Sequence, residues 1–262
     1  MTYTLITGAS AGLGKAFAIQ CARMGMNLVL IALPGSQASS LAQHIMEEYP
    51  VDVRAFELDL TDTAQMQYHL PEILSAFPVS FLINNAGIGG TAALADTPLE
   101  NIDRIIQLNV RGTALLTRLM IPHLLQHERS YILNISSMAS FTPIAYKTVY
   151  PASKAFITSF SLGIREEYAG TGLSVSVACP GPILTNSGTA RRIIGQGLKA
   201  RMGLLPTHEI ARIALRLTLA GQPVIIPGLA NRISHFLMQL MPGSMRLRLI
   251  SREVKKEMQF SV

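Results

Sequence analysis

The fold of this chain is decided by residues 7–14, Thr-Gly-Ala-Ser-Ala-Gly-Leu-Gly. This segment follows an apolar run, Tyr3–Thr7, and opens a helical pattern that begins at Leu13. Glycines between a strand and a helix permit a tight turn, and they let backbone N–H groups and the positive helix end approach a pyrophosphate. Glycines alone are also explained by a turn without a ligand, so the remaining chain has to supply the context.

Apolar runs typical of buried strands recur along the chain, and segments of helical length separate them. The predicted strands are Tyr3–Thr7, Asn27–Leu33, Val51–Leu58, Val79–Asn84, Ser130–Ser136, Leu173–Ala178 and Pro223–Pro227. The predicted helices are Leu13–Arg23, Gln37–Tyr49, Thr63–Ala76, Pro98–Gln126, Tyr150–Ala169 and Thr207–Ala220. This alternation indicates βαβ units. We therefore predict an α/β fold, a doubly wound parallel sheet (Rossmann type) of about seven strands with helices on both faces.

The helix predicted from Pro98 has a start signal of its own. Thr97 would be its N-cap, Pro98 would take the first helical position, and Glu100 lies three residues after Thr97. These residues form the pattern of a capping box.

Composition excludes several classes of protein. Of 262 residues, 49% are hydrophobic and 15% are charged, which excludes a disordered or fibrous chain. Cys21 and Cys179 have neither the number nor the spacing of a disulfide framework or a zinc site, so we expect no metal and a cytoplasmic location. Without an apolar run of spanning length or a basic leader, we expect neither a transmembrane helix nor a signal peptide.

The net charge of +6 is unevenly distributed. Residues 1–190 carry 10 basic and 13 acidic side chains, net −3, whereas residues 191–262 carry 12 and 3, net +9. Nucleic acid is not an expected partner, because the basic part lacks a recognised reading motif and the chain has no Trp and only 6% aromatic residues.

Tyr150 and Lys154 are candidate catalytic residues. Their i, i+4 spacing places a phenol and an ammonium on one helical face. The preceding strand delivers Ser136 and Ser137 to the C-terminal edge of the sheet, where ligands of such folds bind. A phenol with a pKa of about 10 is a weak acid at neutral pH, and a nearby cation lowers that pKa. Tyr146 has no lysine four residues later, so it is either a wall of the substrate pocket or simply exposed.

Together these motifs resemble the short-chain dehydrogenase/reductase family, whose cofactor signature is Thr-Gly-x-x-x-Gly-x-Gly. Residues 84–87, Asn-Asn-Ala-Gly, residues 59–60, Asp-Leu, and residues 180–185, Pro-Gly-Pro-Ile-Leu-Thr, follow in the family's order. The resemblance covers about residues 1–228. It implies an NAD(P)-dependent oxidoreductase that transfers hydride between a nicotinamide cofactor and a carbonyl or secondary alcohol.

The resemblance also implies a role for each catalytic residue. Tyr150 would be the general acid and base, and Lys154 would lower the pKa of Tyr150 and bind the nicotinamide ribose. The usual thirteen-residue gap selects Ser137, rather than Ser136, as the residue that polarises the substrate carbonyl. Asn109 would help to hold a proton-relay water.

The same motifs predict the cofactor-binding residues, which include two members of this catalytic tetrad. They are Gly8, Ser10, Gly12, Leu13, Gly14, Leu33, Ser36, Asp59, Leu60, Asn85, Ala86, Gly87, Tyr150, Lys154, Pro180, Gly181, Ile183 and Thr185. After the second strand, residues 32–36 hold neither the acid that NAD-dependent enzymes commonly use nor the Arg typical of NADP. We expect NADP(H) in preference to NAD(H), because nothing there repels a 2′-phosphate and Ser36 can donate to it.

Two segments leave alternatives open. Residues 186–205 occupy the family's substrate loop, whose basic residues are Arg191, Arg192, Lys199 and Arg201. These residues are either solvated charges or contacts for an acidic carrier such as coenzyme A or acyl carrier protein. Residues 231–262 form a basic extension beyond a catalytic domain of residues 1–230. One interpretation is that the extension forms a helix pair that packs on the domain or on a partner subunit. The other is that it forms an amphipathic surface that lies on an anionic membrane.

A weaker resemblance to 17β-hydroxysteroid and long-chain 3-oxoacyl reductases implies a lipophilic small-molecule substrate. Family membership also implies a homodimer or homotetramer. A dinucleotide-sensing regulator on the same fold is the alternative function, although such a protein would typically have lost part of the tetrad.

Overall fold

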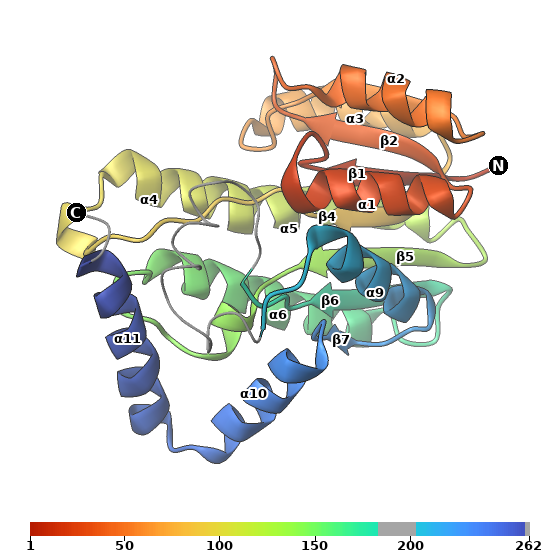
Figure 1. Ribbon diagram of the computed structural model, residues 1–262. Coiled ribbons are helices and arrows are strands. Elements are labelled where there is room, and N and C mark those ends of the chain that lie inside the picture. Colours follow the sequence, from red (N-terminus) through yellow and green to blue (C-terminus); the bar gives the residue numbers. More distant parts are fainter. Residues whose placement is uncertain (183–202, 260–262) are drawn as a thin grey trace.

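The computed structural model describes residues 1–182 and 203–259 and contains a seven-stranded parallel sheet (Figure 1). Its strands are β1 Tyr3–Thr7, β2 Asn27–Ala32, β3 Val53–Glu57, β4 Val79–Asn84, β5 Ser130–Ile135, β6 Leu173–Ala178 and β7 Val224–Ile225. They lie in the order β3-β2-β1-β4-β5-β6-β7, which confirms the predicted doubly wound sheet. The chain changes direction across the sheet between β1 and β4, where folds of this class form their ligand crevice.

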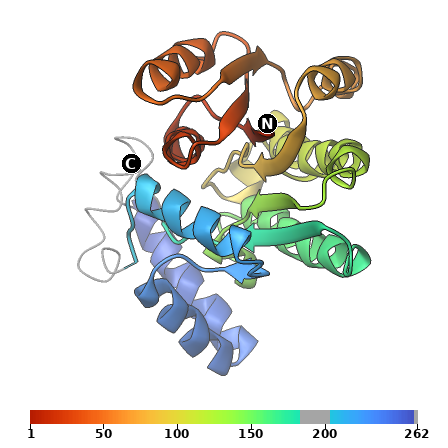
Figure 2. The ribbon, with the colours of Figure 1, turned by 90° about the vertical axis from the view of Figure 1, so that its right-hand side faces the viewer.

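Helices cover both faces of the sheet, as Figure 2 shows from the side. One face packs against α1 Gly12–Arg23, α2 Ala38–Glu48 and α9 Thr207–Leu219, and the other against α3 Thr63–Ala76, α5 Thr113–Leu124 and α6 Val149–Glu167. Leu5 and Ile6 are adjacent in β1, yet they belong to the two different hydrophobic cores. Burial on both faces explains why the strands are continuously apolar rather than alternating.

The helical run after residue 98 differs from its prediction at the start. It consists of α4 Leu99–Ile105, a π-helical segment η2 Ile106–Gly112, and α5. The capping box is wrong, because Pro98 occupies the cap position without a side-chain hydrogen bond. The Thr97 hydroxyl instead donates to the Ala93 carbonyl, at 2.9 Å, and so closes the preceding short turn.

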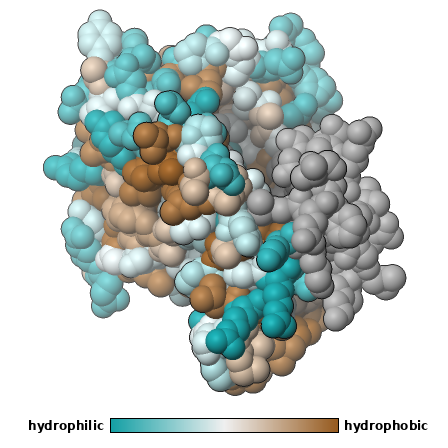
Figure 3. All heavy atoms as spheres, turned by 90° about the vertical axis from the view of Figure 1, so that its left-hand side faces the viewer, coloured by the Kyte–Doolittle hydropathy of each residue, from teal (hydrophilic) through white to brown (hydrophobic). Residues whose placement is uncertain are grey.

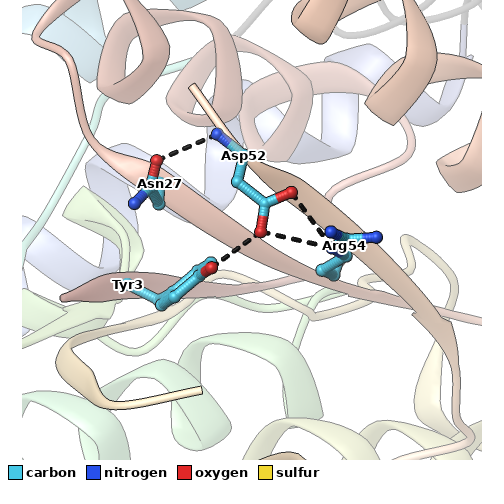
Figure 4. Close-up of polar contacts among 4 residues, drawn as sticks. All are labelled: Tyr3, Asn27, Asp52 and Arg54. Carbon is cyan, nitrogen blue, oxygen red and sulfur yellow. Dashed lines mark hydrogen bonds and ion pairs between the residues drawn. The ribbon is translucent and has the colours of Figure 1, made fainter. Parts of the chain in front are cut away.

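A polar cluster joins the N-terminal ends of three strands (Figure 4). The Tyr3 hydroxyl donates to Asp52 Oδ2 at 2.7 Å, the Asp52 N–H donates to Asn27 Oδ1 at 2.9 Å, and Arg54 Nε lies 3.0 Å from Asp52 Oδ1. The hydrogen bond to Asp52 is the main cause of a raised pKa for Tyr3. This cluster joins β1, β2 and β3 at the end opposite to the glycine turn, which leaves the other end of the sheet for function.

Two C-terminal helices, α10 Leu229–Leu240 and α11 Gly243–Gln259, project from the sheet body as a V (Figure 1). Asn231, in the first turn of α10, is buried. Its Nδ2 donates to the carbonyls of Gly203, at 3.0 Å, and Pro227, at 2.8 Å. A Cβ on Gly181 would lie 2.7 Å from Asn231 Oδ1, so these two residues are in close contact. Within the described part of the chain, no helix combines the length and the apolarity needed to cross a membrane.

Candidate active site

The glycine turn brings two backbone segments unusually close. Gly8 and Gly12 have φ angles of +63° and +55°, in the left-handed region that glycine adopts readily. A Cβ on Gly14 would lie 2.0 Å from the Gly8 carbonyl oxygen and 2.6 Å from Asn85 Nδ2. The first turn of α1 therefore packs directly against the Gly8 peptide, an arrangement that fits a pyrophosphate at the N-terminus of this helix.

Asn85 and Thr7 fix the shape of this turn. Asn85 Nδ2 donates to the carbonyls of Thr7, at 3.0 Å, and Gly8, at 3.2 Å. In return, Thr7 Oγ1 accepts from the N–H groups of Asn85 and Ala86, both at 3.0 Å. Thr7 was missing from the predicted site residues, although its position at the end of β1, directly before Gly8, was the signal that could have identified it.

The loop after β4 extends from the glycine turn to the predicted catalytic residues. A Cβ on Gly87 would lie 3.2 Å from both Asn109 Oδ1 and Lys154 Nζ. On Gly89 it would lie 3.0 Å from Tyr150 Cδ2. This one loop thus brings the predicted cofactor residues and three members of the tetrad together.

Asn109 is buried within the π-helical segment η2, a type of distortion that is frequent at functional sites. Its Nδ2 donates to the Ile88 carbonyl, at 2.8 Å, and to Ser153 Oγ, at 3.0 Å. Its Oδ1 accepts from the Ile88 N–H at 2.9 Å. Asn109 therefore fixes the loop beside Tyr150. Ile88 and Ser153 are not among the predicted site residues, and the backbone groups of Ile88 leave no signature in a sequence.

Lys154 lies next to the C-terminal end of β5, beside Tyr150. Its buried Nζ donates to the Ile135 carbonyl at 2.8 Å and lies 5.9 Å from the centroid of the Tyr150 ring. Ser137 shares a hydrogen bond with the Tyr150 hydroxyl. Ser136 is buried and donates to the Lys154 carbonyl at 2.8 Å, so it has a structural partner of its own.

Burial dominates the acid–base properties of this pair. It raises the pKa of Tyr150, an effect that the hydrogen bond with Ser137 opposes. Burial also lowers the pKa of Lys154 to about 8. The raised pKa differs from the sequence prediction, in which Lys154 lowers the pKa of Tyr150, because desolvation of the phenol is the largest cause and outweighs the hydrogen bond with Ser137.

The low pKa of Lys154 predicts a pH-dependent contribution to stability. Below about pH 8, Lys154 is charged in both the folded and the unfolded chain, and the folded chain bears the cost of a buried ammonium. Between about pH 8 and 10.5, the ordinary pKa of lysine, the unfolded chain binds more protons, so stability rises with pH. Across this interval, the free energy of unfolding of the wild type should rise relative to that of Lys154→Met in urea titrations. A difference that is constant or falls would contradict this prediction.

Four of the predicted cofactor-binding residues follow the ends of β2 and β3. Asp59 Oδ1 accepts from the N–H and the hydroxyl of Thr61, at 2.9 and 2.8 Å. Leu60 is buried, whereas Leu33 is exposed. Ser36 Oγ is buried and has no hydrogen-bond partner among the described residues, so it is available to a ribose or phosphate group of a dinucleotide.

The remaining predicted residues lie at the two ends of the site. Ser10 is half-buried in the glycine turn, and the Leu13 side chain packs in the core, so only its backbone can face a ligand. Pro180 and Gly181 follow β6, and the Pro180 carbonyl accepts from the Met138 N–H at 2.9 Å.

Several sequence predictions concern residues outside the described ranges. These are the predicted contacts Ile183 and Thr185 and the basic loop residues Arg191, Arg192, Lys199 and Arg201. Residues 1–182 and 203–259 contain no group of three or more His, Cys, Asp or Glu side chains that could hold a metal ion.

Comparisons with known proteins agree with this geometry. The family model described as short chain dehydrogenase matches residues 2–193. The very-long-chain 3-oxoacyl-CoA reductase of Anas platyrhynchos is 32% identical over 182 residues, which cover 68% of this chain and 58% of that protein. The chain thus spans little more than half the length of this curated relative.

Solved structures share the fold over almost the whole chain. A 7beta-hydroxysteroid dehydrogenase has a TM-score of 0.86 at 24% identity, with coverage of 95% of this chain and 96% of that one. A short-chain dehydrogenase from Sphingobium yanoikuyae, in complex with NADPH, has a TM-score of 0.77 at 29% identity, covering 92% and 97%. One from Burkholderia phymatum, in complex with NAD, has a TM-score of 0.79 at 24% identity, covering 91% and 92%.

Proposed function

The chain belongs to the short-chain dehydrogenase family, and we propose that it is an NAD(P)-dependent oxidoreductase acting on a lipophilic carbonyl or secondary alcohol. The observation that carries this proposal is the convergence of Ser137, Tyr150 and Lys154 with the glycine turn, through the loop after β4. A bound nicotinamide cofactor would supply or accept the hydride.

The residues of this chain would manage the substrate oxygen and its proton. As a carbonyl accepts hydride, its oxygen becomes an alkoxide and needs a proton, which the Tyr150 hydroxyl is placed to give. The Ser137 hydroxyl, already hydrogen-bonded to Tyr150, would donate to the same oxygen and orient it. Lys154 would favour the tyrosinate left after proton transfer, and Asn109 would keep the loop beside Tyr150 in place.

The proposal is tested by following cofactor consumption with ketosteroids, long-chain 3-oxoacyl thioesters and simple aldehydes. We expect turnover of the lipophilic ketones at lower concentrations than the simple aldehydes, because a substrate with more apolar surface gains more free energy when it leaves water. No turnover of any of these compounds would contradict the proposal. Dinucleotide binding without turnover would support the regulatory alternative.

We further propose NADP(H) as the preferred cofactor, a choice supported by the unpartnered Ser36 Oγ and the lack of an acid at residues 32–36. Calorimetric titration should give tighter binding of NADPH than of NADH. Ser36→Ala should reduce the NADPH affinity by roughly tenfold to a hundredfold, as expected for one hydrogen bond to a charged group, and change NADH affinity less. Tighter binding of NADH to the wild type would refute this preference.

Three finer proposals accompany the activity. A homodimer or homotetramer is proposed from family membership. Peripheral contact of residues 231–262 with an anionic membrane is supported by six basic against two acidic residues in that segment. A cytoplasmic location stays a prediction from the two cysteines.

A further inference from the structure

Helix α10 carries a stripe of exposed apolar side chains. Its members lie at i, i+4, i+7, i+8 and i+11, on one side of the helix, and each is between 50% and 68% exposed: Leu229, Ile233, Phe236, Leu237 and Leu240. Asn231 is the buried residue of this helix. Single exposed apolar residues need no explanation, but a continuous stripe of this kind marks an interaction surface.

Helix α11 adds apolar and basic side chains to the same projecting V. Met245 and Leu249, one turn apart, are 55% and 49% exposed. Residues 229–255 contain five basic side chains and one acidic side chain; the basic ones are Arg232, Arg246, Arg248, Arg252 and Lys255. In Figure 3, which shows the left-hand side of Figure 1, hydrophilic side chains adjoin hydrophobic ones on the lower, projecting part of the molecule. We call the exposed faces of α10 and α11 the V surface.

The sides of α10 and α11 that face the body contact the loop that leads to the catalytic residues. The His235 ring packs against Phe141, with ring centroids 4.1 Å apart. Ser251 Oγ accepts from the Ala145 N–H at 3.1 Å. Next to Ala145, Tyr146 adopts a φ of +65°, which is uncommon for a residue with a side chain, and its carbonyl accepts from the Ala92 N–H at 2.8 Å. Both helices thus contact residues 138–149, between Ser137 and Tyr150.

We propose that the V surface lies on an anionic lipid bilayer and presents the mouth of the active site to substrate dissolved in that bilayer. The part about substrate rests on the proposed function, whereas the part about lipid binding does not. Amphipathic helices with an apolar stripe and basic residues lie in the membrane interface, and the excess of basic residues complements anionic headgroups. The α10 stripe would enter the apolar boundary, and the arginines of α11 would contact the headgroups.

Lipid binding is tested by sedimentation of the full chain with vesicles of phosphatidylcholine and phosphatidylglycerol in equal parts, against vesicles of phosphatidylcholine alone. The wild type should bind the anionic vesicles more tightly. The stripe variant Phe236→Asp/Leu240→Asp and the charge variant Arg248→Glu/Arg252→Glu should each lose at least about tenfold in binding. Circular dichroism would verify that each variant is folded.

The matched control is Arg212→Glu/Arg216→Glu, which makes the same charge change on exposed residues of α9, outside the V surface. It should retain most of the binding. Equal loss in this control, or a wild type that binds neither vesicle, would overturn the proposal. The proposal would also be overturned if the wild type did not bind vesicles and the stripe variant had a different oligomeric mass from the wild type. The surface would then contact a second copy of the chain.

A second measurement separates this proposal from the enzymatic one. The first substrate is a lipophilic ketone that the wild type reduces, dissolved in anionic vesicles. With this substrate the rate of the stripe variant should be lower by at least about tenfold, because the variant binds the vesicles less tightly. With a water-soluble carbonyl in buffer, its rate should match the wild type. Vesicle binding without any turnover would leave the lipid surface standing and contradict the proposed function alone. Equal losses with both substrates would contradict delivery from the bilayer.

Discussion

Replacing Tyr150 by phenylalanine should lower kcat by about 10²–10⁴-fold, the range typical of a lost general acid or base. The phenylalanine ring can keep the packing of the tyrosine ring against Gly89 and near Lys154, so the change removes the hydroxyl and little else. The affinity for the dinucleotide should change far less than kcat, because the glycine turn and Lys154 are unchanged. Steady-state kinetics and calorimetry on one preparation measure both quantities.

Tyr168→Phe is the matched control for this substitution. Tyr168 follows α6 directly, so the same hydroxyl is removed at the other end of the helix that carries Tyr150. Its kcat should equal that of the wild type. If Tyr150→Phe retained full activity, the assignment of the proton donor would be wrong, whatever the fate of the control.

Gly14→Ala should disrupt both the fold of the glycine turn and the binding of the dinucleotide. The added Cβ would lie 2.0 Å from the Gly8 carbonyl oxygen, a backbone atom that cannot rotate away as a side chain can. We expect a loss of about 1–3 kcal/mol in the free energy of unfolding, as for overpacked cores. The affinity for NADPH should fall at least about tenfold, because the Gly8 peptide has to move.

Gly163→Ala supplies the control, since Gly163 is also helical and a Cβ there would meet nothing within 4 Å. Alanine is the better helix former, so this variant should gain about 0.5–1 kcal/mol in stability and bind NADPH as the wild type does. Chemical unfolding and calorimetry distinguish the two variants. A Gly14→Ala protein as stable as Gly163→Ala would show that the turn has more room than the structure indicates.

The sheet and its helices were predictable because their signals are local. Strands buried on both faces read as continuous apolar runs, and each predicted strand lies within two residues of its observed bounds at either end. The start of α4 was not predictable from Thr97 and Glu100, because a threonine before a helix can also donate to a carbonyl behind it, as Thr97 does to Ala93.

The site was partly predictable for the same reason. Tyr150 and Lys154 can be identified from their i, i+4 spacing on one helix. The contacts of Asn109 with the Ile88 backbone depend on a loop whose path no side-chain pattern records. The pKa of Tyr150 also depends on how deeply the folded chain buries the phenol, which spacing does not reveal.

Asn231 has a consequence for how the extension can be altered. By sequence it is the first residue beyond the catalytic domain, yet its amide joins Gly203 to Pro227 and its side chain contacts Gly181. A truncation before residue 231 would therefore remove these hydrogen bonds within the body together with the V. Loss of activity in such a protein would say nothing about membrane binding. Grafts or deletions of the V should therefore retain Asn231, and any that remove His235 or Ser251 also remove contacts with residues 138–149.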